Sequence, residues 1–161
     1  MDELTAAIYR GSVEDVSAAV RSGIDVNRMD RDGFTPLMEA VLAGTPRTEI
    51  VALLLDLGAD PRAKEEGQGT TVLHFAARER LTEIVALLLE RNVEVDALDC
   101  FGNTPLWRAT MGKRPATGVV ELLVAHGADP GKANHSGVSP RSLGCSKPEL
   151  RNLLGCAGSA S

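Results

Sequence analysis

The chain has 161 residues, of which 43% are hydrophobic, 24% are charged and only 3% are aromatic. This length and apolar content suit a single domain, and the shortage of aromatic residues predicts an aliphatic, helical core. The formal net charge of −5 argues against a nucleic-acid partner. It suits a basic protein partner, although mild acidity is also common among proteins without one.

Cysteine usage and the hydrophobic pattern bear on the cellular compartment. Cys100, Cys145 and Cys156 are odd in number and widely spaced, so we expect neither a disulfide framework nor a zinc site. The acidic first residues lack the apolar run of a secretion signal, and no stretch of about 18 apolar residues predicts a membrane helix. Together these features predict a cytoplasmic protein in a reducing environment, without membrane attachment.

Residues 2–30 predict a capping unit made of two helices. Asp2 can cap a first helix that ends near Gly11, and a second helix over about 13–22 ends at Gly23. Small and polar residues on the second helix fit the water-facing side of a terminal unit.

One motif, Thr-Pro-Leu-x-x-Ala, then recurs along the chain. It begins at Thr35, and later copies begin at Thr71, Thr104 and, in degraded form, Ser139. The steps between copies are 36, 33 and 35 residues, and a fixed period of this size is typical of stacked repeats. Threonine caps a helix start and proline fits the first helical position, so each copy predicts a helix after a glycine-containing turn.

The period divides the rest of the chain into units. We expect full repeats at residues 31–66, 67–99 and 100–134, then a cap at 135–154 and a flexible tail at 155–161. The second helix of each full repeat is apolar on almost every side, which suits a helix packed between two neighbours.

This pattern resembles the ankyrin repeat, which has a period of about 33 residues and a Thr-Pro-Leu-His-x-Ala signature. The resemblance covers about residues 2–154. It implies an all-α solenoid of helix-turn-helix units with hairpin-like turns, with three full repeats between two caps. His74 matches the motif histidine, which by the resemblance bonds to neighbouring backbone.

No motif in the sequence points to catalysis. The chain lacks His-Glu-x-x-His, Cys-x-x-Cys and Gly-x-Ser-x-Gly, as well as a phosphate-binding glycine loop. A catalytic Cys145 with a distant histidine stays open, but no feature supports it. We therefore predict a protein that is not an enzyme and that needs neither a metal nor a cofactor.

In ankyrin repeat proteins, the turn tips and the first helices line a concave groove that commonly binds another protein. The resemblance implies partner contacts at the matching positions, which are Arg31, Asp32, Phe34, Leu42, Gln68, Thr70, Arg78, Glu79, Phe101, Asn103, Trp107, Met111 and His135. Phe34 and Phe101 are either binding anchors or packing between tips. Trp107 is either an anchor or a filler of the space that the motif histidine would take.

A second surface is suggested by basic residues in and near the loops between helices. These residues are Arg47, Arg80, Lys113 and Arg114. They form either a solvated edge or a strip that meets an acidic surface of a partner.

These observations predict a protein-binding module that is a monomer when free. The first hypothesis is an inhibitor or an immunity-type protein that neutralises a cytoplasmic toxin. The alternative is an adaptor, a scaffold or a regulator of a cellular enzyme such as a kinase.

Overall fold

The computed structural model describes residues 1–112 and 114–156. Within these residues the chain forms nine α-helices and one 3₁₀ helix, and the only extended pairing is an isolated bridge between Lys64 and Thr71. The prediction of an all-α repeat solenoid is confirmed.

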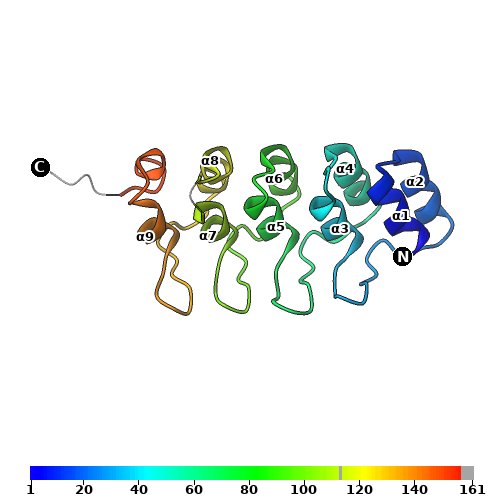
Figure 1. Cartoon of the computed structure of the whole chain (residues 1–161), viewed down its shortest axis with the longest axis horizontal. Helices are drawn as coiled ribbons and strands as arrows, with labels where there is room; N and C mark the ends of the chain where they lie inside the picture. The colour runs from blue at the N-terminus through cyan, green and yellow to red at the C-terminus, as the bar shows by residue number, and fades with distance from the viewer. Residues whose placement is uncertain (113, 157–161) are drawn as a thin grey trace, which may run out of the picture.

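The helices lie in two parallel rows that run from one end of the molecule to the other (Figure 1). The inner row holds α1 (Glu3–Arg10), α3 (Pro36–Leu42), α5 (Val72–Arg78), α7 (Pro105–Thr110) and α9 (Pro140–Gly144). The outer row holds α2 (Val13–Arg21), α4 (Thr48–Asp56), α6 (Thr82–Leu89) and α8 (Thr117–Ala125), followed by the 3₁₀ helix η1 (Pro148–Leu150).

Contacts between neighbouring units build one continuous core. Each inner helix packs against the next inner helix, and each outer helix packs against the next outer one. The core is aliphatic as predicted, since leucines at equivalent positions of the full repeats are almost completely buried: Leu37, Leu73 and Leu106 inside, and Leu54, Leu88 and Leu123 outside. Stability in such a stack comes largely from the interfaces between units.

The recurring threonine motif starts the inner helices as predicted. The hydroxyls of Thr35, Thr104 and Ser139 accept hydrogen bonds from the backbone N–H three residues later, at 3.4, 3.1 and 3.1 Å. Proline follows each of these caps at the first helical position, where the missing N–H costs nothing.

Hairpin-like turns project from the inner row, on the side away from the outer row (Figure 1). We call them the first to fourth fingers: residues 30–34, 65–70, 99–103 and 134–138. In each finger the backbone N–H of the first residue donates to the carbonyl oxygen of the last. The repeat boundaries given above, which fall in or beside the fingers, remain our proposal.

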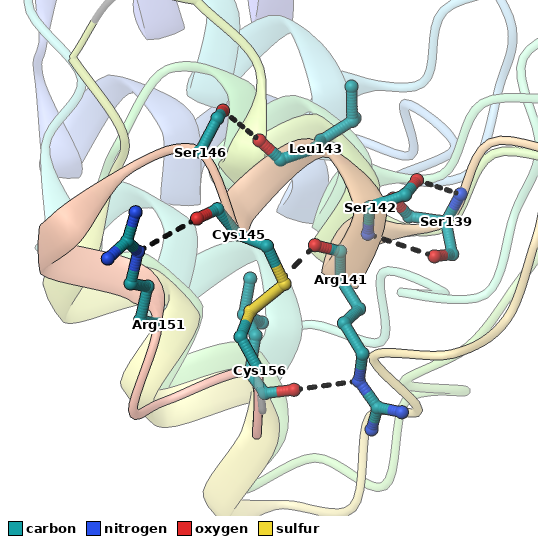
Figure 2. The surroundings of a disulfide bond; sticks show 9 residues. Ser139, Arg141, Ser142, Leu143, Cys145, Ser146, Arg151 and Cys156 are labelled. Carbon is teal, nitrogen blue, oxygen red and sulfur yellow. Dashed lines mark hydrogen bonds between the residues drawn. A yellow bond between two sulfur atoms is a disulfide. The ribbon is translucent and has the colours of Figure 1, made fainter. Parts of the chain in front are cut away.

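The carboxyl end corrects one expectation from the sequence. Cys145 and Cys156 form a disulfide with an S–S distance of 2.02 Å (Figure 2), so the prediction of no disulfide was wrong. The two cysteines are 11 residues apart, and the chain turns back after α9 so that their Cα atoms lie 5.6 Å from each other. A single pair at this spacing matches none of the multi-cysteine frameworks that sequence reasoning looks for.

Further contacts hold this end of the chain against the last unit. Arg141 Nε donates to the Leu154 carbonyl oxygen at 2.9 Å, and Arg151 Nε donates to the Cys145 carbonyl oxygen at 2.9 Å. Leu154 is fully buried against Gly144, where an added Cβ would clash with Leu154 Cδ1. Of the predicted tail, Cys156 is thus tied to the cap, and residues 157–161 lie outside the described residues.

Candidate protein-interaction surface

Side chains at the base of the fingers fix the shape of three of them. Asp30 Oδ1 accepts hydrogen bonds from the backbone N–H groups of Asp32 and Phe34, both at 2.9 Å. Asp99 and Asn134 repeat this arrangement in the third and fourth fingers. Each of the three lies five residues before the threonine or serine of its motif, so the period of the sequence contains this signal too.

The second finger is one residue longer than the others, as its sequence shows. Its base residue is Glu65, whose side chain has one more methylene than aspartate and accepts from the backbone N–H of Gln68. Glu65 is buried, and a longer side chain here serves a longer turn.

Neighbouring fingers bond to each other through their backbones. Cys100 N–H donates to the Gln68 carbonyl oxygen at 2.8 Å, and His135 N–H donates to the Phe101 carbonyl oxygen at 3.0 Å. Gly102 has a φ of 76°, and a Cβ there would lie 2.7 Å from the His135 ring. The second, third and fourth fingers therefore form a connected row.

His74 joins the second repeat to the third finger. Its Nδ1 lies 2.8 Å from Thr71 Oγ1, and its Nε2 lies 3.0 Å from the Asn103 carbonyl oxygen. Burial lowers the pKa of His74, and the hydrogen bond to the Asn103 backbone opposes this only in part. The residue is 1% exposed and has a structural role, as the resemblance implied.

A buried carboxylate organises the third finger. Besides the two finger bonds, Asp99 accepts from Asn103 Nδ2 at 3.1 Å and pairs with Arg108 Nη2 at 2.6 Å. Burial alone would raise the pKa of Asp99, but the hydrogen bonds from Asn103, Arg108 and the Phe101 backbone outweigh it and lower the pKa. Sequence reasoning missed the roles of Asp99 and Arg108.

The amino-terminal unit is joined to the first repeat by a second charged network. Thr5 Oγ1 donates to Glu39 Oε1 at 3.1 Å, and Arg28 Nη2 lies 3.6 Å from Glu39 Oε2. Arg28 Nε also lies 2.6 Å from Asp2 Oδ2. Burial raises the pKa of Glu39, and the bonds from Thr5 and Arg28 only partly offset that effect.

Two aromatic rings lie side by side on the inner-helix face. The ring centroids of Phe34 and Phe75 are 5.8 Å apart, and the Arg78 guanidinium lies 5.3 Å from the centre of Phe75. These residues border a hollow of about 170 Å³, which we call the aromatic pocket. Its lining is Phe34, Glu65, Gln68, Thr70, His74, Phe75, Arg78 and Arg108. Phe34 thus packs on a helix residue, whereas Phe101 is 52% exposed on the third finger.

The predicted contact residues fall into three groups by exposure. Most lie in solvent, namely Arg31, Asp32, Gln68, Arg78, Glu79, Phe101, Met111 and His135. Phe34, Leu42 and Trp107 are half-buried. Thr70 and Asn103 are 4% exposed, so they support the fingers and offer little surface to a partner.

The structure rearranges the predicted basic edge. Arg80 and Arg114 line one hollow together with Arg78 and Arg108, and of these four arginines the sequence had left out only Arg108. Arg47 instead packs against Gly11 of the amino-terminal unit, where an added Cβ would lie 2.5 Å from Arg47 Nε. Lys113 lies outside the described residues.

The described part of the chain shows neither a metal-binding cluster nor a membrane-spanning helix. Across residues 1–112 and 114–156, no group of three or more His, Cys, Asp or Glu side chains is placed to hold a metal ion. None of the helices in these ranges has the length and apolar character needed to cross a bilayer.

Comparison with known proteins adds a family and several relatives. A family model described as ankyrin repeats (3 copies) matches residues 3–65 and 47–134. The chain is 33% identical over 104 residues to cyclin-dependent kinase 4 inhibitor B of Bos taurus, which covers 65% of this chain and 77% of the relative.

Other relatives are much longer than the matched region. Ankyrin repeat and SOCS box protein 6 of Homo sapiens is 32% identical over 147 residues, covering 79% of this chain and 35% of the relative. Ankyrin repeat and KH domain-containing protein mask of Drosophila melanogaster is 38% identical over 105 residues, covering 65% of this chain and 3% of the relative.

Proposed function

Because this chain belongs to the ankyrin repeat family, whose repeats are protein-protein interaction modules, we propose that it binds one partner protein through its fingers and inner helices. It acts by binding rather than by catalysis. The observation that carries this proposal is the connected row of fingers, which presents exposed side chains such as Gln68, Phe101 and His135 along one edge.

The finer proposal is that binding inhibits or regulates the partner. The similarity to a protein named as a kinase inhibitor, over 77% of that protein, supports an inhibitor or a regulator of an enzyme. An immunity-type role against a cytoplasmic toxin is a narrower form of the same idea. An adaptor role is the second candidate, because other relatives are named for additional domains beside their repeats.

The charge of this protein bears on the kind of surface that its partner presents. The net charge of −5 favours a basic surface on the partner. At the amino-terminal end, one hollow of about 630 Å³ is bordered by four acidic and two basic side chains: Asp2, Asp30, Asp32, Glu39, Arg28 and Arg31. We propose that the free protein is a monomer of 17.0 kDa, which light scattering on a sizing column measures directly.

Affinity capture from native lysate tests the binding proposal. Phe101→Ala/Gln68→Ala should release the captured protein, because it removes exposed finger side chains and leaves the backbone bonds between fingers in place. Glu121→Ala, on the exposed side of α8, is the matched control and should retain it. A partner held equally by all three proteins would contradict the proposed face, and a dose-dependent loss of the partner's activity supports inhibition.

We propose the cytoplasm as the compartment. The Cys145–Cys156 disulfide bears on this proposal, because disulfides persist mainly in oxidising compartments. Alkylation of thiols in intact cells, followed by mass measurement, decides the matter. Labels on Cys145 and Cys156 support the cytoplasm, and label on Cys100 alone would point to an oxidising compartment.

A further inference from the structure

Four arginines surround one hollow at the ends of α5 and α7. The hollow has a volume of about 490 Å³ and is lined by Arg78, Arg80, Arg108, Met111, Gly112 and Arg114, which together we call the arginine pocket. Among the described residues, none of those that line it is acidic, although the chain as a whole has 22 acidic against 17 basic residues. General basicity of the protein therefore does not explain the cluster.

Local backbone geometry brings these side chains together from two repeats. Arg78 is the last residue of α5, and Arg80, two residues further on, has a φ of 63°, a conformation uncommon outside glycine. This turn directs Arg80 to the third repeat, where its Nη2 donates to the Pro115 carbonyl oxygen at 3.3 Å. Arg114 comes from the loop between α7 and α8, residues 111–116, which is three residues longer than the matching loop of the second repeat, residues 79–81.

The positive charge of the pocket is only partly balanced within the protein. Arg78 pairs with Glu79 at 2.8 Å, but both side chains are almost half exposed, and such pairs are weak. Arg108 pairs with the buried Asp99. No carboxylate of the described residues lies within ion-pair distance of Arg80 or Arg114. Since a guanidinium has five N–H donors, most donors in the pocket remain for a ligand.

Apolar surface lies beside these charges and favours a peptide ligand over a bare anion. Met111 in the lining is 46% exposed. The aromatic pocket, with Phe34 and Phe75, shares Arg78 and Arg108 with the arginine pocket, so the two hollows adjoin. A ligand that fills both needs an oxyanion next to an apolar group, and arginine binds carboxylate and phosphate groups alike with two parallel hydrogen bonds.

We propose that the arginine pocket receives an oxyanion-bearing side chain of the partner protein, within a segment whose neighbouring apolar residue enters the aromatic pocket. This inference rests on the proposed function and specifies the chemistry of the partner. The oxyanion comes either from glutamate or aspartate or from a phosphorylated serine or threonine, and the arms of the test separate these two sources.

The test uses three fluorescent peptides that share one leucine-containing frame and carry two glutamates, one phosphoserine or two lysines. Anisotropy titration of the full chain should show binding of the glutamate peptide, the phosphoserine peptide or both, and none of the lysine peptide. Binding should weaken as the ionic strength rises from about 10 to 150 mM. Binding of the phosphoserine peptide alone assigns the site to a phosphorylated partner.

Arg80→Gln/Arg114→Gln should lower the affinity by about tenfold or more, because it removes the two guanidinium groups of the pocket that have no carboxylate partner among the described residues. Arg10→Gln/Arg21→Gln changes the net charge equally at the far end of the stack and should leave the affinity unchanged. Thermal unfolding followed by circular dichroism verifies that both variants are folded.

Several outcomes would overturn the inference. They are equal affinity in wild type and Arg80→Gln/Arg114→Gln, binding of the lysine peptide, tighter binding of a single-stranded oligonucleotide, and failure of both acidic peptides to bind. A partner that the lysate experiment captures equally with Arg80→Gln/Arg114→Gln overturns this inference alone. Absence of any captured partner counts against the proposed function itself.

Discussion

His74 Nε2 lies 3.0 Å from the carbonyl oxygen of Asn103, so one side chain of the second repeat is bonded to the backbone of the third finger. Because the same ring also contacts Thr71, it links a helix start to the neighbouring finger. The repeats are therefore joined by specific polar contacts as well as by the aliphatic core.

His74→Ala should lower the free energy of unfolding by about 2–3 kcal/mol, because it opens a cavity and removes the polar contacts of the ring with Thr71 and with the Asn103 carbonyl oxygen. Urea denaturation measures this change. His126→Ala removes an exposed histidine and should stay within about 0.5 kcal/mol of wild type. Equal effects of the two substitutions would contradict the linking role of His74.

Stability should also fall on mild acidification. Burial lowers the pKa of His74, so below the ordinary histidine value of about 6.5 the unfolded chain takes up a proton that the folded protein resists. The His74 contribution is thus complete above that value and is lost as the pH falls toward the lowered pKa. Denaturation curves should be measured from about pH 7 to about pH 5, a range that spans the ordinary histidine pKa. Over this range the free energy of unfolding should fall more steeply in wild type than in His74→Ala.

Asp99→Ala should destabilise the protein by about 3–5 kcal/mol, because it removes a buried carboxylate and leaves the Arg108 guanidinium and two finger N–H groups without an acceptor. Asp30→Ala removes the matching bonds of the first finger without an arginine partner and should cost less. The lowered pKa of Asp99 means that its contribution is present above the ordinary aspartate pKa and is lost only as the pH falls through the lowered value.

Gly102→Ala and Gly137→Ala form a matched pair in two fingers. Both glycines have positive φ, but a Cβ at Gly102 would meet His135 at 2.7 Å, whereas nothing lies within 4 Å of a Cβ at Gly137. Gly137→Ala should cost about 1 kcal/mol from backbone strain alone, and Gly102→Ala should cost clearly more. Similar unfolding midpoints for the two variants would show that the His135 side chain can move away from an added Cβ at Gly102 without loss of stability.

Reduction of the Cys145–Cys156 disulfide should destabilise the carboxyl-terminal cap. The cysteines are 11 residues apart, and release of a loop of this size costs about 2–3 kcal/mol. Wild type with reductant should unfold at the same lower temperature as Cys145→Ser/Cys156→Ser, which itself should not respond to reductant. Cys100→Ser, at an exposed free cysteine, should behave as wild type.

Local rules explain why so much of the fold could be predicted from the sequence. The caps at Thr35 and Thr104 follow from hydrogen bonding within one repeat, and the largely apolar outer helices of the full repeats follow from its hydrophobic pattern. The disulfide was missed because the contact depends on how the chain turns back after α9, which cysteine spacing alone does not reveal.

The candidate site was harder to predict, because its contacts join different repeats. Resemblance placed Phe34 on a finger, but its packing on Phe75 is a contact with α5 of the next repeat. The arginine pocket likewise depends on the turn at Arg80, where a residue other than glycine adopts a positive φ. The sequence grouped Arg80 with Arg114 on one edge and did not include Arg108.

The bonds between fingers also bear on how readily this protein could change its specificity. Cys100 and His135 join their neighbours through main-chain atoms, so the bonds do not require any particular side chain at Gln68 or Phe101. Those tips can therefore mutate without loss of the scaffold, and new partners become accessible to evolution at small cost in stability. The same property makes the fingers a practical starting point for a library of engineered binders.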